Sequence, residues 1–248
     1  MTPLLVLLLC VVMVGTAFLS GLFGMAGGLV LVGVLLLLLP LPAAMALHAV
    51  TQIASNLWRA VLWRRHVRLR AAWPFLAGSV LALGVWSVVL FVPDRAMALL
   101  LLGLSPFAVR LLPARLAPDP HRLPDGLGFG AASMSLMLLT GVSGPLVDTL
   151  FLSSQLDRRE IVATKAVCQV AGHALKLLYF GGLIEGAALV DPAMAFAAIV
   201  CSVLGTTLAR RLLDAMTEAT FRRWANRLVT AIALVCVAQG TALMMAGG

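Results

Sequence analysis

Charged residues are scarce in this chain of 248 residues: only 11% are Asp, Glu, Lys or Arg, and 62% are hydrophobic. A soluble globular domain carries roughly 25% charged and about 45–50% apolar residues. A soluble chain of this length has too little interior to cover so much apolar surface. The composition therefore excludes a soluble globular domain and predicts a protein that is solvated by lipid.

Cysteine is also rare, with four residues in the chain. All of them lie inside apolar runs and none forms a Cys-x-x-Cys pair; they are Cys10, Cys168, Cys201 and Cys236. A buried free cysteine behaves as a small hydrophobe, and a zinc or disulfide framework needs recurring cysteine spacings. We therefore expect no metal site, no disulfide framework and no cofactor.

Acidic residues are fewer than basic ones, which gives a formal net charge of +8. The arginines stand in short groups between apolar runs, as at Arg64, Arg65 and Arg68. Cytoplasmic loops of membrane proteins carry this excess, so the charge indicates topology and not a nucleic-acid partner. The distribution predicts loops 64–70 and 157–159 inside, both termini outside, and a location in the inner (plasma) membrane.

The apolar runs have the length of membrane helices, which need about 20 residues. Six runs have this length, at 43–63, 73–92, 95–112, 160–182, 191–209 and 224–245. Two longer stretches, 4–39 and 126–156, are interrupted by glycine-rich segments. Each of them predicts a helical hairpin with a short second arm. Its bend should face the protein interior, because lipid cannot satisfy non-helical backbone.

The two halves of the sequence match each other. Residues 46–59 (ALHAVTQIASNLWR) align with residues 163–176 (ATKAVCQVAGHALK) at a constant offset of 117, which pairs Gln52 with Gln169. An odd number of net crossings in each half would invert the second copy. We therefore predict an all-α, polytopic helical membrane protein with two inverted repeats, each a broken helical hairpin plus three transmembrane helices. The repeats span residues 1–113 and 126–248, with a cytoplasmic linker at 114–125.

A polar stripe runs along one face of a helix in each half. It consists of His48, Gln52, Asn56 and Arg59 in the first half, and of Lys165, Gln169, His173 and Lys176 in the second. Their spacing places each set on one helical face. Such residues within a span usually line an interior or a pathway. For the charges near the helix ends, snorkelling to the membrane surface is an equal alternative.

The glycine-rich bends add helix N-termini, at Gly27–Gly28 and at Ser143–Gly144. Free N–H groups and the helix dipole at such a terminus favour an anion. With no acidic ring in the sequence, we expect a small anionic solute, bound by Gly27, Gly28, Gln52, Asn56, Ser143, Gly144, Gln169, His173 and Lys176. Asp148, Lys165, Arg59 and His48 are expected to form an ion pair or to couple transport to an ion, with proton and sodium both open. Asp148 has Lys165, Lys176 and His173 as alternative partners.

The first bend, Ser20-Gly21-Leu22-Phe23-Gly24-Met25-Ala26-Gly27-Gly28, resembles the bend of the TauE/SafE family of sulfite and organosulfonate exporters. That family repeats a Ser-Gly-x-x-Gly-x-Gly-Gly-Gly pattern in both halves, and Ala26 here occupies one glycine position. The segment Thr140–Pro145 resembles a variant of the second copy. The resemblance implies a secondary transporter that exports sulfite or an organosulfonate, driven by an ion gradient.

Two other interpretations are open from the sequence. Gly141-Val142-Ser143-Gly144 contains the Gly-x-Ser-Gly pattern of intramembrane serine proteases, with His173 as a base that would need to meet Ser143 in space. A membrane assembly protein without transport activity is the second alternative, and it predicts that the glutamine pair tolerates substitution. The inverted duplication favours a transporter over an enzyme.

Overall fold

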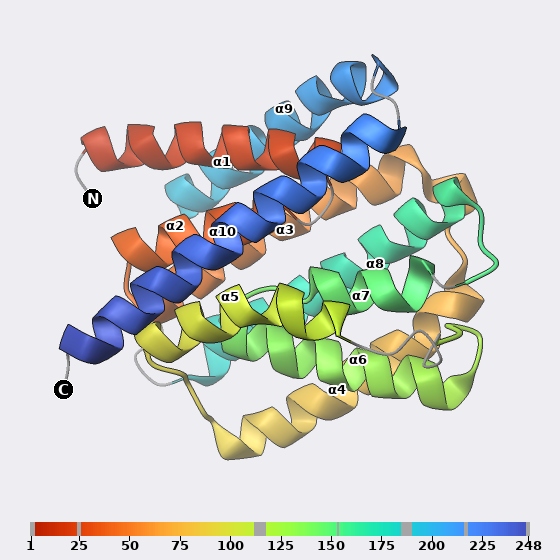
Figure 1. Ribbon diagram of the computed structural model, residues 1–248, viewed down its shortest axis with the longest axis horizontal. Helices are drawn as coiled ribbons and strands as arrows, with labels where there is room; N and C mark the ends of the chain where they lie inside the picture. The colour runs from red at the N-terminus through yellow and green to blue at the C-terminus, as the bar shows by residue number, and fades with distance from the viewer. Residues whose placement is uncertain are drawn as a thin grey trace.

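The computed structural model describes residues 3–23, 26–111, 118–152, 154–184, 190–215 and 218–246, and these residues form helices with no strand. The helices run side by side, mostly along one direction (Figure 1). They are α1 (Pro3–Phe23), α2 (Ala26–Leu38), α3 (Leu41–Leu62), α4 (Leu69–Val89), α5 (Arg95–Arg110), α6 (Leu123–Thr140), α7 (Gly144–Leu152), α8 (Arg158–Leu178), α9 (Pro192–Ala215) and α10 (Glu218–Ala246). The predicted all-α fold is confirmed.

Within the described residues, five helical segments are long and apolar enough to cross a membrane: Pro3–Leu22, Leu69–Val89, Arg159–Leu183, Pro192–Ala209 and Asn226–Ala246. The prediction of a multi-pass membrane protein is confirmed. Helix α3 has the predicted length but is not among the five, because its polar stripe lowers its hydropathy. Helices α2 and α5 are apolar but shorter than a full span.

Both predicted hairpins are present. The long arm α1 is followed by the 13 residues of α2, and α6 is followed by the 9 residues of α7. At the second bend Gly141 has φ 87°, and its N–H donates to the carbonyl of Met137 at 2.8 Å, so this glycine closes α6 in the left-handed region. The residues Gly24 and Met25 of the first bend lie outside the described part of the chain.

The ends of the short arms differ from the prediction. Helix α2 begins at Ala26, so Gly27 and Gly28 lie in its first turn and not before it. Helix α7 ends at Leu152, whereas the apolar pattern extended the arm to residue 156. Helix α8 begins with a capping box in which Asp157 accepts the backbone N–H groups of Arg159 and Glu160. These bonds, that of Glu160 first, hold the pKa of the Asp157 carboxyl below its ordinary value.

Helices of each half of the chain pack against helices of the other half. Helix α1 of the first half packs on α9 of the second, and α6 of the second half packs on α4 of the first. Two further pairs join the halves, α3 with α8 and α5 with α10 (Figure 1). Glycines allow close backbone contact between α1 and α9 and between α4 and α6. Gly205 lies against the Val14 carbonyl of α1, and Gly130 lies against the Phe75 carbonyl of α4.

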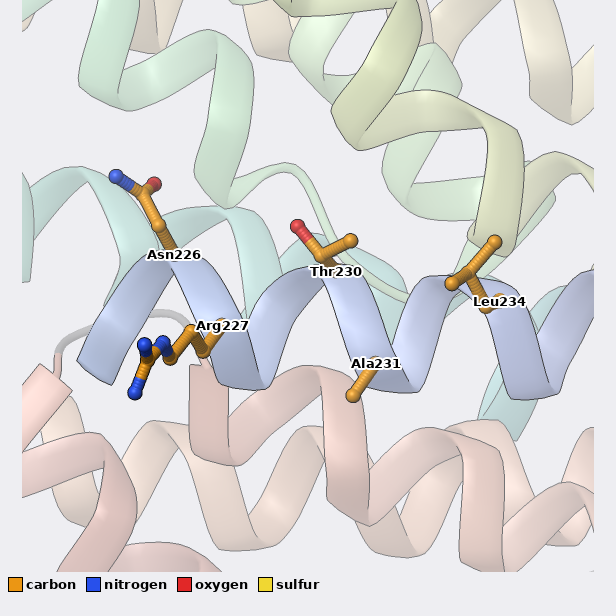
Figure 2. Close-up of a pocket in the computed structure, with 5 residues that line it drawn as sticks. All are labelled: Asn226, Arg227, Thr230, Ala231 and Leu234. Carbon is orange, nitrogen blue, oxygen red and sulfur yellow. The ribbon is translucent and has the colours of Figure 1, made fainter. Parts of the chain in front are cut away.

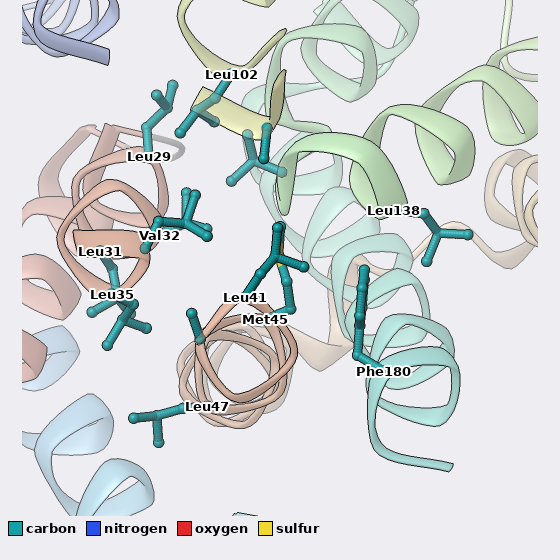
Figure 3. Packing of buried hydrophobic residues seen from close by; sticks show 14 of the residues in the cluster. Leu29, Leu31, Val32, Leu35, Leu41, Met45, Leu47, Leu102, Leu138 and Phe180 are labelled. Atoms are coloured by element: carbon teal, nitrogen blue, oxygen red, sulfur yellow. The ribbon is translucent and has the colours of Figure 1, made fainter. Parts of the chain in front are cut away.

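The hydrophobic core lies around α2, which is buried along most of its length. Figure 3 shows Val32 of this helix pointing toward Met45 of α3, with Phe180 on the other side of Met45. The outward faces of the long helices carry exposed leucine and valine side chains, as lipid contact requires. This packing places the short arms of the hairpins beside the polar faces of α3 and α8.

Candidate functional site

The polar stripes of α3 and α8 come together in the interior, because these two helices pack against each other. We call their facing sides the α3–α8 seam. On α3, His48, Gln52 and Asn56 are all buried. On α8, His173 and Lys176 are buried, with Lys176 at 0% exposure. The snorkelling alternative is therefore wrong for Lys176, whose side chain has no access to the surface.

One end of the seam is organised by His48, and we call it the His48 end. The Nε2 atom of His48 lies 2.9 Å from the carbonyl oxygen of Gly28, in the first turn of α2. Its Nδ1 atom lies 2.6 Å from Nζ of Lys176, which also donates to the carbonyl oxygen of Gly141 at 3.0 Å. The two side chains thereby connect the first hairpin to the bend of the second.

Two polar atoms beside this chain of hydrogen bonds have no partner. Nε2 of Gln52 and Nδ1 of His173 are both buried without a hydrogen bond. The His173 ring lies edge-on to the His48 ring, with 5.4 Å between centroids. The Gln52 amide lies against Gly28, where a Cβ would come within 3.2 Å of Gln52 Oε1. Buried polar groups are normally hydrogen-bonded, so two unpartnered groups beside a buried lysine indicate the place of a ligand.

The other end of the seam is organised by Arg59, and we call it the Arg59 end. Arg59 donates to Oδ1 of Asn56 at 3.3 Å and to the backbone carbonyl of Ser20, in α1, at 3.1 Å. Asn56 in turn donates to the carbonyl of Gln52 at 2.8 Å. Gln169 is half-buried on the facing helix. Arg59 therefore points into the protein, and its partners in the described part of the chain are neutral.

Asp148 forms an ion pair with Lys165, so α7 is bonded to α8 at this end of the seam. Of the three partners that the sequence left open for Asp148, the structure selects Lys165. The Asp148 carboxylate also attracts the Arg59 guanidinium electrostatically, but no ion pair joins them.

Two of the bend residues that were expected to bind the anion, Gly27 and Ser143, contribute to the packing and helix start of the hairpins. A Cβ on Gly27 would overlap the carbonyl of Thr16 in α1, so Gly27 serves the close contact between the hairpin arms. The carbonyl of Ser143 accepts the N–H groups of Leu146 and Val147, which starts α7 directly before Gly144. Of Gly27, Gly28, Ser143 and Gly144, the one with a hydrogen bond to a seam side chain among the described residues is Gly28, whose carbonyl binds His48.

Sequence reasoning missed the backbone acceptors of the site. The carbonyls of Gly28, Gly141 and Ser20 hold His48, Lys176 and Arg59 respectively. Side-chain patterns carry no signal for a carbonyl acceptor, although both bends were expected at this depth.

Three other candidate sites have less support in the structure. No group of three His, Cys, Asp or Glu residues that could hold a metal occurs in the described part of the chain. A pocket of about 390 Å³ lies on the surface of α10 (Figure 2), lined by Asn226, Arg227, Thr230, Ala231 and Leu234. Its exposed position on an outer helix separates it from the seam. For the protease hypothesis, no hydrogen bond joins Ser143 to His173, and the Nδ1 atom of His173 is unpartnered.

Comparison with known proteins identifies one relationship. The model of the family described as Sulfite exporter TauE/SafE matches residues 7–236. No curated protein and no solved structure matches the chain significantly. The match covers both hairpins and the whole seam, and it confirms the resemblance inferred from the first bend. This is a family of transporters, which agrees with the prediction of a transporter and not an enzyme.

Proposed function

The chain belongs to the sulfite exporter TauE/SafE family of membrane transporters, and we propose that it exports a small sulfur oxyanion, such as sulfite or an organosulfonate, along the α3–α8 seam. The family implies a small anionic solute and a lipid bilayer around the protein. Beyond what the family implies, we propose the chemical class of the solute, its path through the protein and the direction of transport. An ion gradient, of protons or sodium, drives the export from the plasma membrane.

The observation that carries the proposal is the pair of unpartnered groups beside Lys176. Gln52 Nε2 is a donor and His173 Nδ1 is a donor in one of its two tautomers. An oxyanion placed between them would accept both hydrogen bonds. It would also neutralise the Lys176 ammonium, whose partners are an imidazole nitrogen and a backbone carbonyl. A buried cation is costly without a negative partner, so an anion is the ligand that best completes this group.

The packing supports transport by alternating access between two inverted repeats. In the two repeats, α1 corresponds to α6, α3 to α8, α4 to α9 and α5 to α10. The contact of α1 with α9 therefore corresponds to the contact of α6 with α4. The α3–α8 and α5–α10 contacts each join two corresponding helices. A two-fold axis in the membrane plane would produce this pattern, as in other transporters. The repeats would comprise residues 1–113 and 126–248, joined by the linker 114–125. The seam would then lie on the axis, where rocking of the repeats exposes it to each side in turn.

The test is a thermal-shift and binding panel on purified protein with sulfite, an organosulfonate, thiosulfate and a carboxylate such as acetate. We expect the sulfur oxyanions to raise the melting temperature and the carboxylate to have little effect. Lys176→Gln should reduce the sulfite effect, whereas the exposed loop variant Arg65→Gln should keep it in full. Equal responses of wild type and Lys176→Gln, or no response to any sulfur oxyanion, would contradict the proposal.

A further inference from the structure

Arg59 has the same kind of surroundings as Lys176. Both are basic residues on the seam, and each donates to a backbone carbonyl near the end of the long arm of a hairpin. Lys176 binds the carbonyl of Gly141, and Arg59 binds that of Ser20, the residue before Gly21. Gly21 is the counterpart of Gly141 in the sequence repeat, at an offset of 120. The contacts of the two cations therefore correspond to each other.

The correspondence extends to the short arms. His48 is bonded to Gly28 of α2, and Lys165, its counterpart at the offset of 117, is paired with Asp148 of α7. Asp148 in turn is the counterpart of Gly28, at the offset of 120. Each end of the seam thus carries the same arrangement of one residue bonded to a short arm and one basic residue bonded to the end of a long arm.

The charges at the two ends do not balance. Asp148 is paired with Lys165, while Arg59 and Lys176 form no ion pair with any carboxylate of the described residues. Among the described residues, the hydrogen-bond partners of both cations are neutral, and the Asp148 carboxylate that attracts Arg59 is already paired with Lys165. Such a cation is unfavourable in a low-dielectric interior. The seam is therefore short of one negative charge at each end.

We propose that the Arg59 end is a second anion subsite, formed by Arg59, Asn56 and Gln169, and equivalent to the subsite of Gln52, His173 and Lys176. This rests on the proposed function of the seam. The repeat pairs Arg59 with Lys176, Asn56 with His173, and Gln169 with Gln52. Guanidinium and amide N–H groups are the donors that a small oxyanion needs.

The spacing allows both subsites to be filled together. Seven residues separate Gln52 from Arg59, a member of each subsite on α3, which at 1.5 Å per residue is about 10 Å. Two anions at this separation repel each other weakly when each is beside its own cation. The solute would enter the subsite nearer its side of the membrane and pass along the seam to the other.

The experiment counts binding sites with ³⁵S-labelled sulfite on purified protein in nanodiscs. We expect about two sites per chain in the wild type and about one in Arg59→Gln and in Lys176→Gln. Arg59→Lys keeps the charge and should retain two sites, and the exposed loop variant Arg65→Gln serves as a matched control that also retains two. Gln169→Ala approaches the same subsite from the other helix and should weaken one site of the two. Size-exclusion profiles and melting temperatures establish that each variant is folded.

The outcomes separate this inference from the proposed function. A single site in the wild type, lost in Lys176→Gln and kept in Arg59→Gln, would overturn the second subsite and leave the proposed function intact. Two sites in Arg59→Gln would overturn it as well. No sulfite binding by the folded wild type would overturn both. If Arg59→Gln does not fold, the site count of Gln169→Ala decides: two sites of unchanged affinity would overturn the inference.

Discussion

The imidazole of His48 lies between two partners, with its Nδ1 atom 2.6 Å from Nζ of Lys176 and its Nε2 atom 2.9 Å from the carbonyl oxygen of Gly28. The carbonyl can only accept, so Nε2 carries the proton. Nδ1 of the neutral ring then accepts a hydrogen bond from Lys176. Lys176 continues the chain to the carbonyl of Gly141. The first turn of α2 is thereby connected to the bend after α6 through two side chains.

His48→Ala should loosen this connection. The substitution leaves the Gly28 carbonyl and one N–H of Lys176 without their partner, at a cost of about 1–3 kcal/mol for each buried group. We expect a lower melting temperature and slower transport, measured by thermal shift and by efflux from cells. The exposed His121→Ala variant is the control and should match the wild type. A wild-type melting temperature in His48→Ala would contradict the connection.

Gln52→Ala and Gln169→Ala should weaken solute binding more than they affect stability. Each substitution removes one hydrogen bond to an anion, worth about 1.4 kcal/mol, which corresponds to roughly tenfold in affinity. Sulfite titration and melting temperature measured on the same variants provide the check. Gln155→Ala, in an exposed loop, is the matched control. Lower stability with unchanged affinity would remove the glutamines as ligands.

Gly27 and Gly28 should respond differently to alanine. At Gly28 the added methyl group would lie 3.2 Å from Gln52 Oε1, and that flexible amide can move by a few tenths of an ångström. Gly28→Ala should therefore fold and bind solute more weakly, by less than the tenfold expected for Gln52→Ala. At Gly27 the methyl group would meet the backbone carbonyl of Thr16, which cannot move without separating α1 from α2. Gly27→Ala should give little folded protein by size-exclusion chromatography, and normal yield would contradict this packing.

The ion pair of Asp148 and Lys165 can be tested by neutralising its members. Asp148→Asn or Lys165→Gln alone leaves one uncompensated charge in a largely buried position. The loss should fall between the roughly 1 kcal/mol of an exposed pair and the roughly 3 kcal/mol of a buried one. The double variant should recover part of the melting temperature, because no charge remains unpaired. Strictly additive losses in the double variant would show that the two side chains do not interact.

The orientation in the membrane remains a prediction from the arginine distribution. A single cysteine at Arg65, in a loop predicted inside, should react with an impermeant thiol reagent only after the cells are opened. A cysteine at Asp94, in the connection between α4 and α5, should react in intact cells. The background is a variant without the native cysteines. The opposite pattern at both sites would reverse the orientation.

The sequence by itself determined the class of the protein and the residues of its seam. Scarce charge and long apolar runs predict membrane helices because lipid is the only solvent that suits them. The spacing of His48, Gln52, Asn56 and Arg59 places them on one face of α3 because a helix has a fixed pitch. The glycine-rich interruptions predict two hairpins, because glycine permits a bend such as the one at Gly141.

The tertiary structure alone decided which groups meet. Asp148 had three basic candidates and pairs with Lys165, and the arginine at position 59 turns inward to the carbonyl of Ser20. Lys176 reaches His48, a residue 128 positions earlier in the chain. These contacts depend on the rotation and depth of α3 and α8 relative to the short arms α2 and α7. Packing across the two halves sets that arrangement, and no local pattern in the sequence encodes it.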